Sequence, residues 1–273
     1  MRQNPDMQRP VITLITDFGQ ADEYVGVVKG VILSHNSHIQ TVDISHRIPP
    51  QDIVAAAHLL ARSFPYFPPA TVHLVIVDPG VGSTRPLLAI TAGDQYFIGP
   101  DNGVFTPIFD HYSSLSVYRV EEADLFLHPV SNTFHGRDIM APVAARLASG
   151  FAIEKVGTEI DSKECTRTAN IAPVYSEEKL YGQVTHVDSF GNLTTNISRA
   201  DIKRFGGGEK ISVHIGNTAI ASISDSYAHG TRGTVVALID SQGFLEIAVN
   251  MGSGAQSLGV STGTPVILRS SEA

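Results

Sequence analysis

Side chains that could activate a water molecule occur in three short glycine-containing segments. Asp17 and Asp22 follow an apolar run near the N-terminus, Asp78 opens a glycine-rich loop that ends at Arg85, and His135 stands just before a helical pattern. A carboxylate can accept a proton from water, and a guanidinium can stabilise hydroxide. An imidazole, with an unperturbed pKa of about 6.5, can orient water or relay its proton. These segments therefore carry side chains that are able to take part in acid–base chemistry.

The apolar pattern predicts how these segments come together. Strands are expected at 11–15, 39–44, 71–77, 87–91 and 95–98, the last two as a hairpin, and helices at 24–33, 53–63 and 139–148. Asp52 is placed to cap the second helix, and Gly150 to end the third. Strands that alternate with helices predict an α/β domain with a mostly parallel, layered sheet. In such sheets ligands bind at the carboxyl ends of the strands, where the reactive side chains lie.

The pattern changes near residue 181, where short β-like runs are separated by polar or glycine-rich turns. We therefore predict an α/β catalytic domain at 1–165, a linker at 166–180 and a smaller all-β, barrel-like domain at 181–273. Two turns of the second domain, at 188–192 and 241–243, also carry polar residues.

Composition excludes several classes of protein. The net charge is −8 and no Lys/Arg cluster stands out, which argues against a nucleic-acid binder. No apolar run approaches the ~20 residues of a membrane span, and the polar N-terminus does not resemble a signal peptide. The single cysteine, Cys165, excludes an intramolecular disulfide and a Cys-based zinc site. A cytoplasmic protein is expected.

Missing motifs narrow the choice of function. The sequence has no Gly-x-Gly-x-x-Gly after a strand, no phosphate-binding loop, no Gly-x-Ser-x-Gly elbow and no His-x-x-x-His pair. Taken singly, each reactive segment also has a local explanation: Asp17 as a helix cap, residues 78–80 as a turn, Asp138 as a loop cap and residues 188–192 as a β-turn. Their clustering at strand ends favours a functional site.

Five segments in matching order resemble a known family. Residues 15–19 (Ile-Thr-Asp-Phe-Gly) with Asp22, 78–82 (Asp-Pro-Gly-Val-Gly) with Arg85, 99–103 (Gly-Pro-Asp-Asn-Gly), 134–138 (Phe-His-Gly-Arg-Asp) and 188–192 (Asp-Ser-Phe-Gly-Asn) look like the S-adenosyl-L-methionine (SAM) hydroxide adenosyltransferases. These SAM hydrolases are the water-using relatives of the SAM-dependent fluorinase and chlorinase. The resemblance extends from about residue 11 to residue 269.

The resemblance implies cleavage of SAM by water at C5′ to give adenosine and L-methionine. It implies no metal and no cofactor, because SAM is the substrate. It also implies a homotrimer whose active sites lie between the N-terminal domain of one subunit and the C-terminal domain of a neighbour. No nucleic acid or membrane partner is expected.

By resemblance, Asp78, Arg85 and His135 match the catalytic set, and Asp17 and Asp22 match positions around the ribose and the reacting carbon. The expected contacts in the second domain are Asp188, Ser241 and Glu246 for the methionine part, Phe190 and Asn192 for the nucleoside, and Val249 and Met251 for adenine. Two departures concern the methionine contacts: Gln242 replaces the arginine of the halogenases, and the 188–192 turn is one residue shorter than in the fluorinase.

Three other functions stay open at this point. One is a SAM-dependent halogenase, although a carboxylate at Asp78 would repel a halide ion. Another is a metal phosphohydrolase that uses Asp17, Asp78, His135 and Asp138. The third is a SAM or adenosine sensor without a catalytic role.

Overall fold

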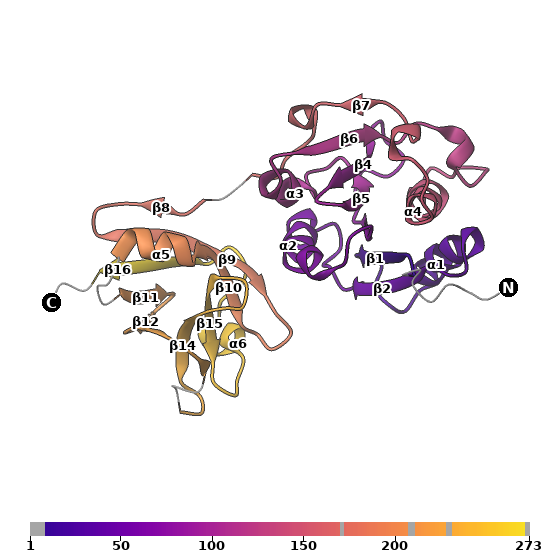
Figure 1. Ribbon diagram of the computed structural model, residues 1–273. Coiled ribbons are helices and arrows are strands. Elements are labelled where there is room, and N and C mark those ends of the chain that lie inside the picture. The colour runs from indigo at the N-terminus through magenta and orange to yellow at the C-terminus, as the bar shows by residue number, and fades with distance from the viewer. Residues whose placement is uncertain (1–8, 170–171, 207–210, 228–230, 271–273) are drawn as a thin grey trace. The chain divides into compact units, whose positions relative to one another are not determined.

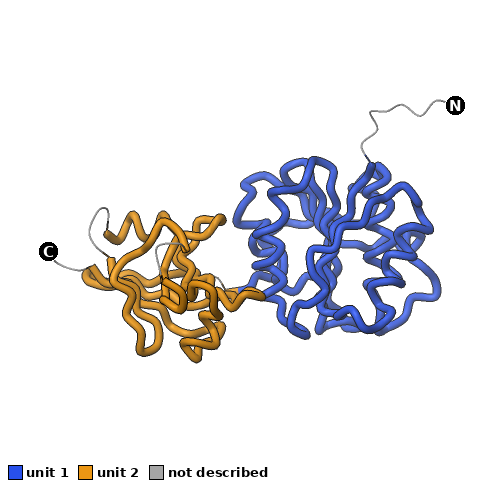
Figure 2. The backbone as a smooth tube through the Cα atoms, turned by 90° about the horizontal axis from the view of Figure 1, so that it is seen from below, with its two compact units in different colours: residues 1–168 blue, residues 169–273 orange. Residues whose placement is uncertain are grey.

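The chain divides into two units after Thr168, which Figure 2 colours separately. The computed structural model describes residues 9–169, 172–206, 211–227 and 231–270. Each unit has its own hydrophobic core. The predicted α/β domain followed by an all-β, barrel-like domain is confirmed. The linker boundaries, 166–180, stay a prediction.

Unit 1 alternates strands and helices, as the apolar pattern predicts (Figure 1). Its elements are β1 (Val11–Thr16), α1 (Tyr24–His35), β2 (Gln40–Ser45), α2 (Ile53–Ser63), η1 (Phe64–Tyr66), β3 (Val72–Ile76), β4 (Leu87–Ala92), β5 (Gln95–Pro100), α3 (Thr106–His111), β6 (Leu115–Arg119), η2 (Ala123–Leu125), η3 (Gly136–Met140), α4 (Ala141–Ala148), η4 (Ile153–Lys155), β7 (Glu159–Ile160) and η5 (Ser162–Glu164). As predicted, Asp52 caps α2, and its Oδ1 accepts the Ala55 N–H at 2.9 Å.

The sheet of unit 1 is parallel on one side and antiparallel on the other. Its order is β2-β1-β3-β5-β4-β6-β7, with parallel pairing from β2 to β5. The predicted hairpin of β4 and β5 reverses the chain through Gly93 and Asp94, both with positive φ, so β4 and the strands beyond it pair antiparallel. The carboxyl ends of β1 and β3 therefore meet at one edge of the sheet.

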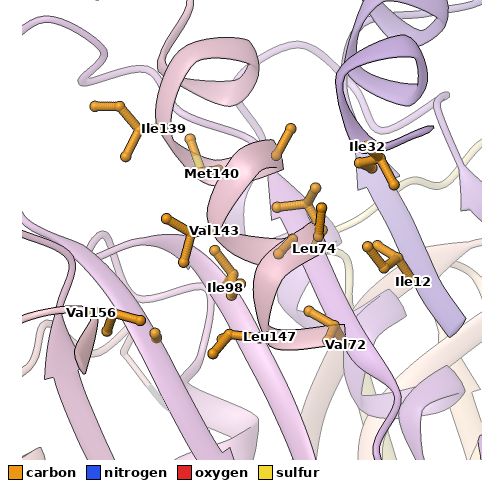
Figure 3. Close-up of a cluster of buried hydrophobic side chains, with 14 of the residues drawn as sticks. Ile12, Ile32, Val72, Leu74, Ile98, Ile139, Met140, Val143, Leu147 and Val156 are labelled. Carbon is orange, nitrogen blue, oxygen red and sulfur yellow. The ribbon is translucent and has the colours of Figure 1, made fainter. Parts of the chain in front are cut away.

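Helices cover both faces of this sheet. On one face, Ile32 of α1 and Val143 and Leu147 of α4 pack against Leu74 and neighbouring strand residues (Figure 3), in a buried cluster that also includes Val28. On the other face, α2 and α3 pack around a second buried cluster. All of the residues of β3 are buried because both faces are covered, which explains its unbroken apolar run.

The helix that carries the third reactive segment begins irregularly. The η3 segment has π-type geometry, in which the Ala141 N–H bonds to the Gly136 carbonyl, and it runs directly into α4. Pro142 has no N–H to donate to the carbonyl of Asp138, and this carbonyl accepts the Leu127 N–H at 2.7 Å. His135 thus stands half-buried at the start of a helix whose following residues are mostly buried.

Unit 2 is a nearly closed sheet. It comprises β8 (Val174–Tyr175), β9 (Lys179–Val187), β10 (Leu193–Ser198), α5 (Arg199–Gly206), β11 (Ile211–Ile215), β12 (Thr218–Ile220), β13 (Ile223–Ser224), β14 (Val235–Ile239), β15 (Phe244–Val249), α6 (Gly254–Leu258) and β16 (Pro265–Ser270). The strand order is β12-β11-β16-β9-β10-β15-β14-β13, with β8 on β9, and β12 contacts β14 near the two ends. Strands such as β11 alternate buried and partly exposed residues around one core.

Candidate active site

Two carboxylates of unit 1 leave the sheet side by side. Thr16, the last residue of β1, is paired with Ile76, the last residue of β3, and Asp17 and Asp78 follow them closely. They line a pocket of about 260 Å³ together with Phe18, Gln51, Phe134 and His135. The pocket therefore lies where parallel strands end, as predicted.

Asp78 and Arg85 form a two-point ion pair. Arg85 Nε donates to Asp78 Oδ1 at 2.7 Å, and Arg85 Nη2 donates to Asp78 Oδ2. The side chains are only 6% and 11% exposed, so the pair lies largely out of water. The planar fork of an arginine fixes a carboxylate in one orientation. Asp78 is therefore held rigidly at the pocket wall.

The imidazole of His135 completes this group. Arg85 Nη2 lies 3.1 Å from His135 Nδ1, and because a guanidinium can only donate, Nδ1 must be the acceptor. The proton of the neutral ring therefore sits on Nε2. Burial and the positive charge of Arg85 lower the pKa of His135 below its ordinary value of 6.5, against smaller opposing effects of Asp78, Asp138 and a backbone hydrogen bond with Ser131. The ring is thus a neutral Nε2–H donor at neutral pH.

Two contacts hold the loop of Asp78 and Arg85 in place. Gly82 has φ +77°, and a Cβ there would lie 2.3 Å from the Asn132 carbonyl oxygen, so only glycine lets this loop approach the loop before His135. Asn102 Nδ2 donates to the carbonyl of Val77 at 2.9 Å, directly before Asp78. The segment at 99–103 thus supports the site through the backbone.

Asp138 has a structural environment. Its carboxylate accepts from Arg137 Nε at 2.6 Å and from the Ser131 N–H at 2.8 Å, and it is buried. Burial opposes its ionisation, but the hydrogen bonds from Arg137 and Ser131 outweigh burial and lower its pKa. Of its two expected roles, loop cap and metal ligand, this environment therefore fits the loop cap.

Asp17 and Asp22 have different surroundings. Asp17 lines the pocket, and its Oδ2 accepts the backbone N–H of Gln51 at 2.8 Å. Asp22 is exposed just before α1 and does not line the pocket. Gln51 was not expected from the sequence, and its left-handed backbone, with φ +67°, could not be read from a glutamine.

The remaining candidates lie in unit 2, where the 188–192 turn is closed by its own side chains. Asp188 Oδ1 accepts the N–H groups of Phe190 at 2.9 Å and Asn192 at 2.8 Å, and Asn192 Nδ2 lies 3.3 Å from Asp188 Oδ2. The turn leaves the Phe190 ring 76% exposed. A rigid turn that presents an exposed aromatic ring can supply a stacking surface.

Glu246 is buried on β15 next to a residue that the sequence did not single out. The hydroxyl of Tyr227 donates to Glu246 Oε1 at 2.5 Å. Burial and this hydrogen bond raise the pKa of Tyr227, and the charges of Asp188 and Asp240 add to the effect. Tyr227, Glu246 and Asp188 thus share one acidic region of unit 2.

Three further candidates in unit 2 lie in or beside turns. Ser241 is exposed in the turn between β14 and β15. Val249 is buried at the end of β15 and pairs with Gly252, and Met251 has φ +55° and is 76% exposed. The side chain of Met251 is therefore open to solvent, whereas that of Val249 is buried.

The described residues contain no group of three or more His, Cys, Asp or Glu side chains that could hold a metal ion. Asp78 is paired with Arg85, and Asp138 with Arg137, so the four residues proposed for a phosphohydrolase do not form one ligand set. No helix within the described ranges is long and apolar enough to cross a membrane.

Comparisons with known proteins agree on one family. A family model of the SAM hydroxide adenosyltransferase N-terminal domain matches residues 12–157, and one of the C-terminal domain matches 182–267. An (R)-S-adenosyl-L-methionine hydrolase of Thermus thermophilus is 37% identical over 95% of this chain and 99% of its own. A fluorinase of Nocardia brasiliensis is 28% identical over 95% of this chain and 96% of its own. A crystal structure of an uncharacterized conserved protein from Thermotoga maritima superimposes with TM-score 0.88 at 37% identity, covering 95% and 99% of the two chains.

Proposed function

We propose that this chain, which belongs to the SAM hydroxide adenosyltransferase family, hydrolyses SAM at C5′ to adenosine and L-methionine. The observation that carries the proposal is the Asp78–Arg85 ion pair with His135 at its edge, in a pocket that also contains Asp17. Hydrolase relatives at 33–37% identity are closer to this chain than the fluorinases, which favours water over halide as the nucleophile.

The chemistry needs an oriented nucleophile more than it needs an activated leaving group. The sulfonium of SAM leaves as a neutral thioether when the C5′–S bond breaks, so no leaving anion has to be stabilised. Water supplies the oxygen that bonds to C5′ and must lose one proton. Correct alignment alone can lower the barrier by roughly 7–11 kcal/mol. The protein therefore has to hold one water molecule in line behind C5′.

The ion pair, His135 and Asp17 each have a distinct role in this step. Asp78 accepts a hydrogen bond, and finally the proton, from the attacking water. Arg85 keeps this carboxylate in place and stabilises hydroxide character. His135, neutral with its proton on Nε2, donates to the water oxygen and orients its lone pair toward C5′. Asp17 accepts hydrogen bonds from the ribose hydroxyls.

We further propose that SAM is the substrate rather than a cofactor and that no metal takes part. The active enzyme is a cytoplasmic homotrimer in which the turns of a neighbouring subunit's unit 2 close the pocket. Asp188, Ser241 and Glu246 then contact the methionine part, and Phe190, Asn192, Val249 and Met251 contact the nucleoside. Asp22 acts near the ribose. Two features support this arrangement: the pocket of unit 1, at about 260 Å³, is smaller than a usual ligand site, and Phe190 and Met251 are largely exposed.

Incubation with SAM in oxygen-18 water tests the reaction. We expect one labelled oxygen in the 5′-hydroxyl of adenosine and none in methionine, measured by mass spectrometry. Unlabelled adenosine, or an absence of both products, would exclude attack of water at C5′. Added chloride should give no 5′-chloro product, and a chelator such as EDTA should leave the rate unchanged.

The variants Asp78→Ala and His135→Ala test the assigned residues. Both should lose turnover by a factor of at least about 100, the usual contribution of general acid–base catalysis, while SAM still binds. Binding is measured by calorimetry and turnover by chromatography of adenosine. Near-normal turnover in either variant would contradict its role, and loss of SAM binding would point to a binding role instead.

A further inference from the structure

The segment that follows β2 holds the turn of Asp17 at three points. The ring nitrogen Nδ1 of His46 lies 2.9 Å from the Thr16 hydroxyl oxygen, the His46 carbonyl accepts the Gly19 N–H at 2.7 Å, and the Gln51 N–H donates to Asp17 Oδ2 at 2.8 Å. Thr16 Oγ1 also accepts the Phe18 N–H at 3.3 Å. Residues 46–51 therefore hold the turn at 16–19 through contacts before, at and after Asp17.

The contact between Thr16 and His46 is the inner end of a longer chain of polar groups. Nε2 of His46 lies 3.1 Å from Asp43 Oδ1, and Lys29 of α1 donates to Asp43 Oδ2 at 2.6 Å. Thr16 and His46 are only 1% and 3% exposed, whereas Asp43 and Lys29 are partly exposed. Asp43 thus lies at ion-pair distance from Nε2, but within the described residues Nε2 has no hydrogen-bond partner, so the contact with Thr16 is the one hydrogen bond of the ring. The ring of His46 is therefore held mainly by its bond to Thr16 and by its burial.

This arrangement leaves one oxygen of Asp17 for a ligand. Oδ2 is bound by Gln51, and within the described part of the chain no group is hydrogen-bonded to Oδ1. A carboxylate that is held before the ligand arrives loses less conformational freedom on binding. We propose that Thr16 and His46 are positioning residues that set the affinity of Asp17 for the vicinal diol of the nucleoside. The inference rests on the proposed function, because that function supplies the ribose.

The same strand offers a matched control. Thr13 of β1 lies 2.8 Å from Nδ1 of the buried His73, so the bond has the same chemistry as the bond between Thr16 and His46. Thr13 stands three residues before the strand end and does not line the pocket. Thr16→Val and Thr13→Val therefore remove equivalent buried hydroxyls, and both should lower the melting temperature. Only Thr16→Val should disturb the ligand.

The experiment measures KM and kcat for SAM and the Kd of adenosine for the two variants and for Thr16→Ser. We expect Thr16→Val to raise KM and Kd roughly tenfold with kcat changed less than about threefold, which is the effect of losing one positioning hydrogen bond. Thr13→Val should stay within about twofold of the wild type in all three constants, and Thr16→Ser, which keeps the hydroxyl, should restore most of the affinity.

The outcomes separate the two proposals. Equal constants for Thr16→Val and Thr13→Val, in a wild type that converts SAM, would overturn the positioning role alone. A wild type that neither converts SAM nor binds adenosine would overturn the proposed function and this inference with it. If Thr16→Val does not fold, His46→Phe, which keeps a ring but removes the nitrogen that contacts Thr16, decides: a rise of about threefold or more in the Kd of adenosine supports the role, and no change overturns it.

Discussion

The ion pair of Asp78 and Arg85 is largely out of water, and this has a consequence for substitution. Removing one partner of such a pair leaves the other charge uncompensated, so part of any loss of activity would come from a damaged fold. A substitution that keeps the charge but changes the hydrogen-bond geometry avoids this difficulty. Lysine in place of arginine does so, because an ammonium is a point charge without a planar fork.

Arg85→Lys should lower kcat about 100-fold while KM for SAM changes little. Lysine cannot bind both oxygens of Asp78 and also reach Nδ1 of His135, so the water would lose its orientation. Arg167→Lys is a matched control, because Arg167 pairs with Asp110 at 2.8 Å in the same unit but at the surface. Steady-state kinetics measure both variants. Full activity of Arg85→Lys would show that the two-point geometry is not required.

The pKa of His135 predicts a pH dependence. Burial and Arg85 lower this pKa below 6.5, so the native protein binds the proton less readily than the unfolded chain does. The contribution of the neutral ring to stability and activity should therefore be complete above pH 6.5 and be lost as the pH falls through the lowered pKa. Protonation of Nδ1 would break its bond with Arg85.

Nuclear magnetic resonance of the imidazole ring measures this directly. The His135 signal, assigned by its absence in His135→Asn, should titrate below pH 6.5, and kcat/KM should be constant through neutral pH. A ring that titrates above 6.5 would contradict the neutral donor role. A ring that is still protonated at neutral pH could not accept from Arg85 at Nδ1.

At the scale of elements, the predictable parts were those whose burial shows in the apolar pattern. β1 and β3 are buried on both faces and appear as short apolar runs, and α2 has both a stripe of apolar residues and the Asp52 cap. β6 (Leu115–Arg119) and α3 were missed, because β6 is only partly buried and α3 has six residues. The antiparallel half of the sheet also follows from tertiary pairing that no local pattern encodes.

The site was predictable at strand ends and not in the segments that support it. Asp17, Asp78 and His135 belong to chemically distinctive segments next to recognisable elements. Gln51 enters the pocket of unit 1 through a backbone N–H and a left-handed conformation, and Tyr227 of unit 2 contacts Glu246 through one long-range hydrogen bond. Neither contact can be recognised from the residue type alone, because any residue can supply a backbone N–H and most tyrosines make no such contact. Backbone contacts and isolated tyrosines therefore need coordinates.

The loop of Asp78 and Arg85 gives a prediction at this scale. Gly82→Ala should lower the free energy of unfolding by roughly 2–4 kcal/mol and reduce kcat, since a Cβ there meets the Asn132 carbonyl in addition to the strain of a positive φ. Gly150→Ala is the control, because Gly150 also has a positive φ but no atom within 4 Å of the added Cβ. It should cost about 1 kcal/mol and leave kcat unchanged. Urea unfolding and steady-state kinetics measure both, and equal effects would show that the loop contact is unimportant.

At the scale of the whole molecule, the proposed substrate contacts are distributed over two units. The proposed catalytic group and Asp17 belong to unit 1, and the turn at 188–192 belongs to unit 2. Within the described residues, each unit has its own hydrophobic core. A site could be built by one chain or by two neighbouring subunits. In a homotrimer with shared sites, mixing two different inactive subunits restores some activity.

Complementation between two inactive variants measures that consequence. Asp78→Asn disables unit 1, and Asn192→Ala weakens unit 2, so each homogeneous enzyme should be nearly inactive. In mixed trimers, some sites combine an intact unit 1 from one subunit with an intact unit 2 from its neighbour. Random pairing of equal amounts should restore about a quarter of wild-type activity, since each site draws its two parts independently.

Co-expression of the two variants with different tags allows the mixed trimers to be isolated, and because each of these has one intact site in three, their activity should rise to about a third of wild type. Sedimentation should give three times the mass of the chain. Activity that stays at the level of the parent variants would show that each site is built within one chain. A mixture of Asp78→Asn with Asp78→Ala is the matched control, because both lesions lie in unit 1 and no pairing can restore a site. Recovery in the first mixture and not in the second would assign the 188–192 turn to a neighbour's active site.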